Sequence, residues 1–383
     1  MSKYKYFVFY SVFLAFLFLV NWQVYSYGLP TLSQYPLLQN IYSTVFWILA
    51  PMFVVARVLE RYYKKKIVSF LLWVGAFWLA MLNYLTLQLL LIYGVLFVTR
   101  NTSVDLFVFH ETYHLVIGTA IGIISFLLSA YGWHNAHHPI IRKLEYIFPK
   151  GSGKGGDFHI VAASDVHLGT MIGKKRFGKF VRDVNLLKPD AIFFVGDTID
   201  EDIEPVIRQD IGSSIKKLHA PLGVFCINGN HEHMGGVERA DAYLMEHGVT
   251  MLRDQFVVLD EAFVLVGRED ISAPMFSGAK RATLHTLLSS IPKNLPIILL
   301  DHQPAAIMET ANDGRVALQL SGHTHHGQLW PFSIMTRLAF KISWGGKKIN
   351  NTEFYVSSGW GTWGPPVRTG NVPELLDIRI RFE

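Results

Sequence analysis

The sequence predicts a chain of two parts: an all-α bundle of membrane helices over residues 1–150 and an α/β domain over residues 151–383. Hydrophobic residues make up 50% of the 383 residues and charged residues only 17%, whereas soluble domains carry about 25% charged residues. Long apolar runs fill the first part, and short apolar runs alternate with amphipathic stretches in the second. The length is sufficient for a membrane part and a domain with a sizeable core.

Four apolar segments of the first part predict membrane-spanning helices, because one crossing takes about 20 helical residues. The third is longer than a straight crossing needs, so we expect one tilted helix there, with two short passes as the alternative. No small-residue cleavage site follows the first segment, so we expect it to remain as a membrane helix. The segments are residues 6–20, 37–59, 67–98 and 115–133.

Basic residues flank these segments unequally. Lys and Arg crowd residues 57–66 and follow the last span, whereas residues 21–36 contain none. Cytoplasmic loops are the ones enriched in Lys and Arg, so we expect an integral, multi-pass protein with both termini and the second domain on the cytoplasmic side. The net charge of +5 lies beside apolar runs, which favours a membrane surface over nucleic acid as the partner. The single cysteine, Cys226, excludes an intramolecular disulfide.

Residues 151–156, Gly-Ser-Gly-Lys-Gly-Gly, predict a flexible linker. After the linker, apolar runs indicate buried strands that alternate with helices, which is typical of an α/β domain. Strands are expected over residues 158–163, 191–195, 223–227, 257–266 (two strands), 296–300 and 316–320. Helices are expected over residues 174–187, 203–218 and 237–247.

Polar side chains suited to metal binding follow five of these strands directly. Ligand sites in α/β sheets gather at the carboxyl ends of the strands, so we expect the side chains to cluster. Asp165 and His167 alternate along an extended segment and can face the same ion. A set of nitrogen and oxygen donors without thiolate suits manganese, iron or zinc. The candidate ligands are Asp165, His167, Asp197, Asn230, His302, His323 and His325.

The order of these motifs is specific. Asp-x-His at 165–167 is followed by Gly-Asp-x-x-Asp at 196–200, Gly-Asn-His-Glu at 229–232, a lone His302, and Gly-His-x-His at 322–325. This pattern resembles the calcineurin-like metallophosphoesterase superfamily, and the upstream spans resemble its membrane-anchored branch. The resemblance implies a four-layer αββα sandwich of two mixed sheets. It also implies two divalent metal ions, for which we expect manganese, with iron, zinc or magnesium as alternatives.

The resemblance also implies a role for each candidate. Asp197 would bridge the two metals; the first would also bind Asp165, His167 and His325, and the second would bind Asn230, His302 and His323. His231 would stabilise the transition state or protonate the leaving oxygen. Asp200 and Glu232 would support the ligands from outside, as metal sites require, although both could instead be capping residues. Asp301 and His326 depart from the usual pattern without removing a ligand.

The segment after the last motif, residues 329–344, combines aromatic and basic residues. It could be a packed loop, or a flap that dips into a lipid surface beside the metals; the loop 359–366 is expected to line the same mouth. The candidate flap residues are Trp330, Phe332, Arg337, Lys341 and Trp344. Our hypothesis is a membrane-bound enzyme that uses a metal-activated hydroxide to hydrolyse a phosphoester or pyrophosphate bond of a lipid-linked substrate, such as UDP-2,3-diacylglucosamine.

Two other functions stay open. A membrane protein could bind phosphorylated ligands without hydrolysing them, although the ligand set is complete. The pattern His110-Glu111-Thr-Tyr-His114 also matches zinc proteases, in which two histidines one helical turn apart bind zinc and Glu acts as base. No third ligand follows at a suitable spacing, so an interfacial belt of His and Tyr explains this pattern better.

Overall fold

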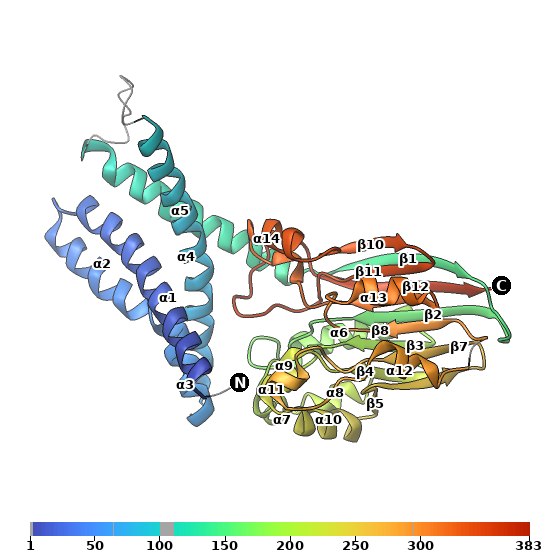
Figure 1. Ribbon diagram of the computed structural model, residues 1–383. Helices are drawn as coiled ribbons and strands as arrows, with labels where there is room; N and C mark the ends of the chain where they lie inside the picture. Colours follow the sequence, from blue (N-terminus) through green and yellow to red (C-terminus); the bar gives the residue numbers. More distant parts are fainter. Residues whose placement is uncertain (1–2, 64, 100–110, 293) are drawn as a thin grey trace. The chain divides into compact units, whose positions relative to one another are not determined.

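The chain divides at His134, earlier than the predicted boundary at residue 150. The computed structural model describes residues 3–63, 65–99, 111–292 and 294–383. One unit comprises Met1–His134 with Gly364–Thr369, and the other comprises Asn135–Trp363 with Gly370–Glu383 (Figure 1). The division falls before residue 150 because Ile140–Phe148 forms a strand, β1, that pairs with the last strand of the second unit.

The first unit is built from long apolar helices. They are α1 (Lys3–Thr31), α2 (Pro36–Leu49), α3 (Met52–Tyr62), α4 (Lys66–Thr99) and α5 (Glu111–Ala136). In the described part of the chain, α1, α4 and α5 are long and apolar enough to cross a membrane, and α2 with α3 forms one further candidate span bent by 44°. The bend falls at Pro51, whose ring is incompatible with a continuous helix.

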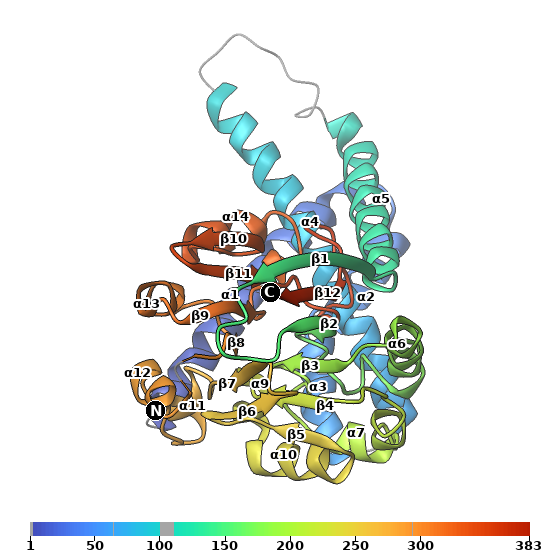
Figure 2. The ribbon, with the colours of Figure 1, turned by 90° about the vertical axis from the view of Figure 1, so that its right-hand side faces the viewer.

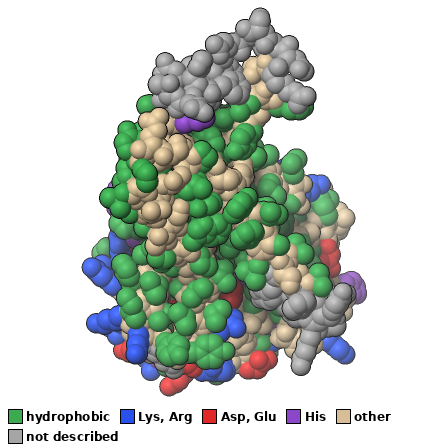
Figure 3. Space-filling view, turned by 90° about the vertical axis from the view of Figure 1, so that its left-hand side faces the viewer, with side chains coloured by type: hydrophobic (Ala, Val, Ile, Leu, Met, Phe, Trp, Pro, Cys, Tyr) green, Lys and Arg blue, Asp and Glu red, His purple; other side chains and the backbone are tan. Residues whose placement is uncertain are grey.

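The four expected spans fall within these helices, and residues 67–98 form one continuous helix instead of two short passes. Many side chains of this unit are apolar and exposed, such as Phe16, Leu37 and Phe97. Hydrophobic side chains cover much of the face seen in Figure 3. An apolar exterior with internally satisfied backbone groups is what the hydrocarbon core of a bilayer requires.

The second unit contains two six-stranded mixed sheets, in the orders β1-β12-β2-β3-β4-β5 and β10-β11-β9-β8-β7-β6. The first comprises β1, β2 (Gly156–Ala163), β3 (Ala191–Val195), β4 (Gly223–Ile227), β5 (Val249–Met251) and β12 (Glu374–Phe382). The second comprises β6 (Gln255–Leu259), β7 (Phe263–Gly267), β8 (Ile297–Leu300), β9 (Val316–Ser321), β10 (Gly345–Ile349) and β11 (Thr352–Val356).

The sheets face each other across a shared apolar core. Phe158, Phe193 and Phe225 of the first sheet belong to the same buried cluster as Phe263 and Leu300 of the second. Helices cover the outer faces, which gives the four layers of the expected αββα sandwich (Figure 2). These helices include α6 (Lys174–Leu187), α8 (Gly212–Ile215) and α10 (Val237–Glu246) on one side, and α12 (Leu284–Ser289) and α13 (Ile307–Asp313) on the other.

Two sequence predictions for this unit are wrong. Residues 151–156 are not a linker between domains: they form the turn from β1 to β2, where the Ser152 amide donates to the Asn294 carbonyl (2.8 Å). Residues 203–218 are not one helix, because Asp210 adopts a left-handed conformation with φ of 51°. This residue separates α7 (Glu204–Arg208) from α8.

Candidate metal centre

The loops after β2, β3, β4, β8 and β9 carry the predicted ligands, and hydrogen bonds tie the first two loops together. The Asp165 amide donates to the Gly196 carbonyl and the His167 amide donates to the Asp197 carbonyl, both at 3.0 Å. The loops are strained, because Asp165, Asp197 and His325 have φ values of 52°, 49° and 45°. Residues other than glycine adopt this left-handed region only when their surroundings compensate the cost.

Two glycines allow the loops to approach the ligand carboxylates. A Cβ atom on Gly229 would collide with the Asp197 carboxylate, and one on Gly322 would collide with the carboxylate of Asp165. Both glycines belong to the sequence motifs, and this close approach explains why those motif positions require a residue without a Cβ atom.

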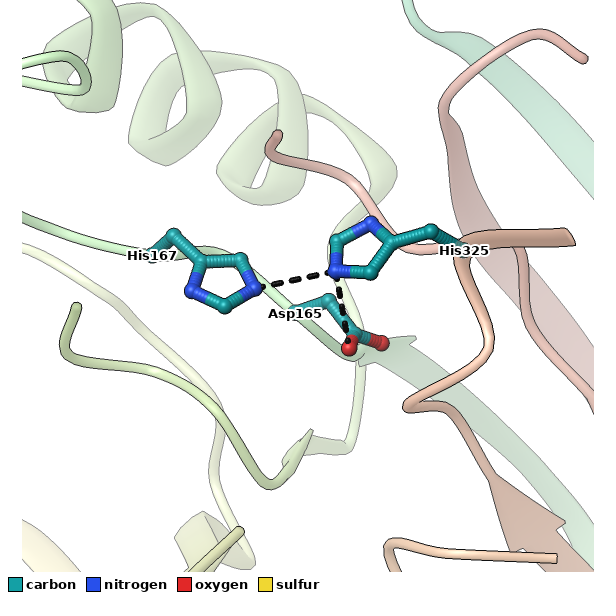
Figure 4. Close-up of side chains that lie close together, drawn as sticks. All are labelled: Asp165, His167 and His325. Carbon is teal, nitrogen blue, oxygen red and sulfur yellow. Dashed lines mark hydrogen bonds and ion pairs between the residues drawn. The ribbon is translucent and has the colours of Figure 1, made fainter. Parts of the chain in front are cut away.

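Asp165, His167 and His325 form a first buried group (Figure 4). The Nε2 atoms of His167 and His325 lie 3.0 Å apart, and His325 Nε2 lies 3.4 Å from Asp165 Oδ1. Figure 4 shows both rings and the carboxylate directing their donor atoms toward one another. Imidazole and carboxylate donors that converge in this way suit a divalent transition metal.

Asp197, His302 and His323 form a second group. His302 Nε2 lies 3.1 Å from Asp197 Oδ2. The side-chain oxygen of Asn230 lies 2.8 Å from His323 Nδ1. The structure therefore brings all seven predicted ligands together in two neighbouring groups.

His302 provides a test of whether a cation fits this site. Its Nδ1 lies 2.8 Å from the Val195 carbonyl, which can only accept, so Nδ1 carries the proton. Its Nε2 is buried and lies 3.1 Å from Asp197 Oδ2; burial opposes protonation of His302, but Asp197 raises its pKa well above the usual value. A ring nitrogen this close to a buried carboxylate oxygen requires positive charge beside it, which either a proton on Nε2 or a divalent cation in its place supplies, so the pair fits a cation.

Asp197 lies between the two groups. Its Oδ2 is 4.0 Å from Nε2 of both His167 and His231, in addition to its contact with His302. Burial would raise the pKa of Asp197, but the surrounding histidines hold it well below the usual value. The carboxylate is therefore ionised and positioned to contact cations in both groups.

Asp200 and Glu232 support the site in different ways. Asp200 Oδ1 lies 3.7 Å from His167 Nδ1 and 3.4 Å from His231 Nδ1, and these three residues form a further cluster of metal-type donors. Burial opposes protonation of His231, but nearby carboxylates, Asp197 first, raise its pKa to about 9. The carboxylate of Glu232 instead accepts hydrogen bonds from the backbone amides of Asp197 (3.2 Å), Ile199 (2.9 Å) and Gly229 (2.8 Å).

The two departures from the family pattern have local explanations. Asp301 is fully buried and forms ion pairs with Arg268 (3.3 Å) and Arg281 (2.7 Å), so its charge is balanced beside His302. His326 is buried against Trp344, with ring centroids 5.1 Å apart. The arginines lie far from Asp301 in sequence, and no motif indicated them.

The predicted flap contains a helix, α14 (Phe332–Ala339). The apolar and basic side chains of this helix are exposed. Trp330, Phe332, Arg337 and Lys341 lie on the surface. Trp344 is also partly exposed, but its indole nitrogen donates to Glu374 (3.2 Å) and Arg142 lies over its ring. Sequence reasoning did not single out Trp363, whose ring lies 6.1 Å from that of His231; the aromatic, glycine-rich composition of residues 359–366 was the available signal.

The protease pattern is only partly covered by the structure. His110 lies outside the described residues, Glu111 begins α5, and His114 lies on that helix. Among the residues that the structure describes, the groups of metal-type donors all lie in the second unit.

Comparisons with known proteins identify the family of the second unit. A family model described as calcineurin-like phosphoesterase matches residues 158–327. An uncharacterized metallophosphoesterase of Aquifex aeolicus is 30% identical over 231 residues, which cover 60% of this chain and 87% of the relative. A transmembrane protein with metallophosphoesterase domain from Bos taurus is 31% identical over 287 residues, covering 71% of this chain and 64% of the relative. The chain belongs to the calcineurin-like phosphoesterase family.

The match extends over only part of several relatives. An uncharacterized metallophosphoesterase of Helicobacter pylori (strain J99) is 32% identical over 229 residues, covering 58% of this chain and 60% of the relative. The chain spans 58% to 60% of the length of three such curated relatives.

Proposed function

We propose that this protein is a membrane-bound phosphoesterase with two metal ions, which hydrolyses a phosphoester or pyrophosphate bond. The observation that carries the proposal is the pair of buried donor groups with the Asp197 carboxylate between them. Two cations a few Å apart suit phosphoryl transfer because together they stabilise the attacking and the leaving oxygens.

Each donor group would hold one ion. Asp165, His167 and His325 would bind the first, and Asn230, His302 and His323 the second, with Asp197 contacting both. When bound, the two cations, for which manganese is the expected metal, polarise the phosphoryl group and activate the attacking water. The buried Glu232 would fix the Asp197 loop through the backbone amides that it accepts.

His231 would protonate the leaving oxygen. Its Nδ1 faces Asp200 and its Nε2 faces Asp197, so one ring nitrogen is directed toward the carboxylate that would contact both ions. Asp200 would act as a positioning residue, because an acceptor at Nδ1 fixes the ring and holds one proton there, so that Nε2 carries the proton that is transferred.

We also propose a lipid-linked substrate taken from the cytoplasmic leaflet, with UDP-2,3-diacylglucosamine as a concrete candidate. The support is local to the second unit: α14 exposes Phe332 and Leu338 together with Arg337. Exposed apolar side chains can enter a lipid surface while neighbouring basic residues meet anionic head groups. The apolar helices of the first unit would keep this domain at a bilayer.

The experiment is an assay of the purified full chain in detergent with Mn²⁺, on bis(p-nitrophenyl) phosphate and on the nucleotide-linked lipid. We expect activity in wild type and Glu111→Gln and none in Asp197→Ala. Asp210→Ala is the matched control, because Asp210 is exposed and pairs with Lys174 on the surface. Phosphate binding without hydrolysis would instead support a silent binding protein, and loss of activity in Glu111→Gln would contradict the proposal.

A further inference from the structure

The loop that follows β11 is attached to the metal-binding loops. The Trp360 amide donates to the Ser164 carbonyl (2.9 Å), and the Gly361 amide donates to the Asp165 carbonyl (2.8 Å). Trp360 itself is buried and packs against Phe180 of α6. The loop backbone therefore follows the segment that carries Asp165.

A second attachment fixes the backbone of Trp363. The Trp363 amide donates to the side-chain oxygen of Gln328 (3.0 Å), and the side-chain nitrogen of Gln328 donates to the Trp363 carbonyl (2.9 Å). Gln328 is buried and follows the motif that contains His325. The Asn371 side chain also donates to the His325 carbonyl. The position of Trp363 is thus tied to the loop that carries a candidate metal ligand.

The side chain of Trp363 remains open to solvent. It is 54% exposed, and its ring lies edge-on to His231, with centroids 6.1 Å apart and an angle of 72° between the planes. A large aromatic surface held rigidly beside a reaction centre gains free energy when a ligand covers it, at little cost in ordering. Among the described residues, hydrogen bonds account for the fixed backbone of Trp363, and packing does not account for its exposed ring.

We propose that Trp363 is a specificity-determining residue that stacks on a flat ring, a nucleobase or an aryl group, in the part of the substrate released beside His231. This inference rests on the proposed function, because it takes the phosphoryl group to lie on the metals and the leaving oxygen to lie at His231. The group beyond that oxygen is then the part of the substrate nearest to Trp363.

The test uses the full chain in detergent with Mn²⁺ and compares Trp363→Ala, Trp363→Phe and wild type. Leu186→Ala is the matched control, because Leu186 is an exposed apolar residue of α6 outside the metal-binding loops. Calorimetry measures binding of thymidine 5′-monophosphate, phenyl phosphate and inorganic phosphate. Kinetics measure KM and kcat for bis(p-nitrophenyl) phosphate and for glycerol 3-phosphate.

We expect Trp363→Ala to weaken binding of at least one ring-bearing ligand by about tenfold, which is typical of lost stacking, and to leave inorganic phosphate unchanged. Trp363→Phe should restore most of the affinity, and the KM effect should be confined to the ring-bearing ester. The nucleotide and phenyl arms identify which ring is preferred. Equal losses for inorganic phosphate, or no loss for either ring, would overturn the inference. Wild type that binds these ligands without hydrolysing any ester would refute the proposed function alone, because the binding comparison still decides the role of Trp363.

Discussion

His167 and His325 are 158 positions apart in the sequence, yet their Nε2 atoms lie 3.0 Å apart. Two imidazole nitrogens at this distance either share a proton or direct their lone pairs at a common cation, and Asp165 Oδ1 at 3.4 Å from His325 favours the cation. This contact brings the first and the last motifs of the chain to one point.

Removal of metal should destabilise the second unit. Five of the seven candidate ligands are buried and the other two, Asn230 and His323, are partly buried, so without cations their charges and lone pairs lose their partners. We expect a chelator to lower the melting temperature by several degrees and Mn²⁺ to restore it, because a ligand that binds only the native state stabilises that state. Differential scanning fluorimetry measures the shift. His325→Ala should lose most of this response, and a chelator effect of equal size in His325→Ala would contradict the prediction.

Asp200→Asn should lower kcat by about 10- to 100-fold with little change in KM, which is the usual cost of losing a group that orients a ligand or a catalytic histidine. A positioning role also predicts a changed pH profile of kcat, because the acceptor on His231 Nδ1 is altered. Asp210→Asn, on the surface, is the control. An unchanged pH profile together with lowered stability would mean that Asp200 acts only in folding.

Gly229→Ala should abolish two-metal binding, since the added Cβ would meet the Asp197 carboxylate and the backbone beside it. Gly178→Ala in α6 is the matched control, because a Cβ there meets nothing within 4 Å and alanine favours the helix. Metal content measured by mass spectrometry on the purified variants decides the prediction, and full occupancy in Gly229→Ala would refute it.

Glu269 should make stability depend on pH. Burial alone would raise its pKa, but hydrogen bonds from His233 (2.7 Å) and Arg253 (2.7 Å) lower the pKa below the usual value. A group with a lowered folded-state pKa contributes stability above its unfolded pKa, about 4.3 for Glu. That contribution disappears as the pH falls through the folded-state value. Melting temperatures from pH 7 to pH 3 should fall less steeply in Glu269→Gln, and the exposed Glu246→Gln should match wild type.

The flap should matter for lipid substrate only. Replacing Trp330, Phe332 and Leu338 by alanine removes exposed apolar surface from and beside α14, while Trp344 stays because it contacts Glu374 and Arg142. We expect turnover of the lipid to fall at least severalfold more than turnover of an aryl phosphate in the same variant. The control replaces Leu186, Ile207 and Met245, which are exposed apolar residues elsewhere in the second unit. Equal losses on both substrates would remove the support for a lipid.

The sequence predicted the motif-bearing strands well, and β3 and β4 have the expected bounds. Each of these strands is a short apolar run that ends directly in a polar motif, so the change in composition marks where the strand ends. The sequence analysis missed β1, because Arg142 and Lys143 interrupt its apolar run and resemble the basic flank of a membrane helix. The ion pairs of Asp301 could not be predicted either, because Arg268 and Arg281 reach it only through the pairing of β7 with β8 and the loop beyond β7.

The left-handed backbone at Asp165, His167, Asp197, His323 and His325 has a consequence outside catalysis. Conformations of this kind persist only when something compensates their cost, and in this protein the bound ions would be part of what compensates it. Under the proposed function, protein synthesised in a cell starved of the proposed metal, manganese, would lack activity and would also be a better substrate for proteases. Its abundance, measured by immunoblot, would follow the metal supply of the cell.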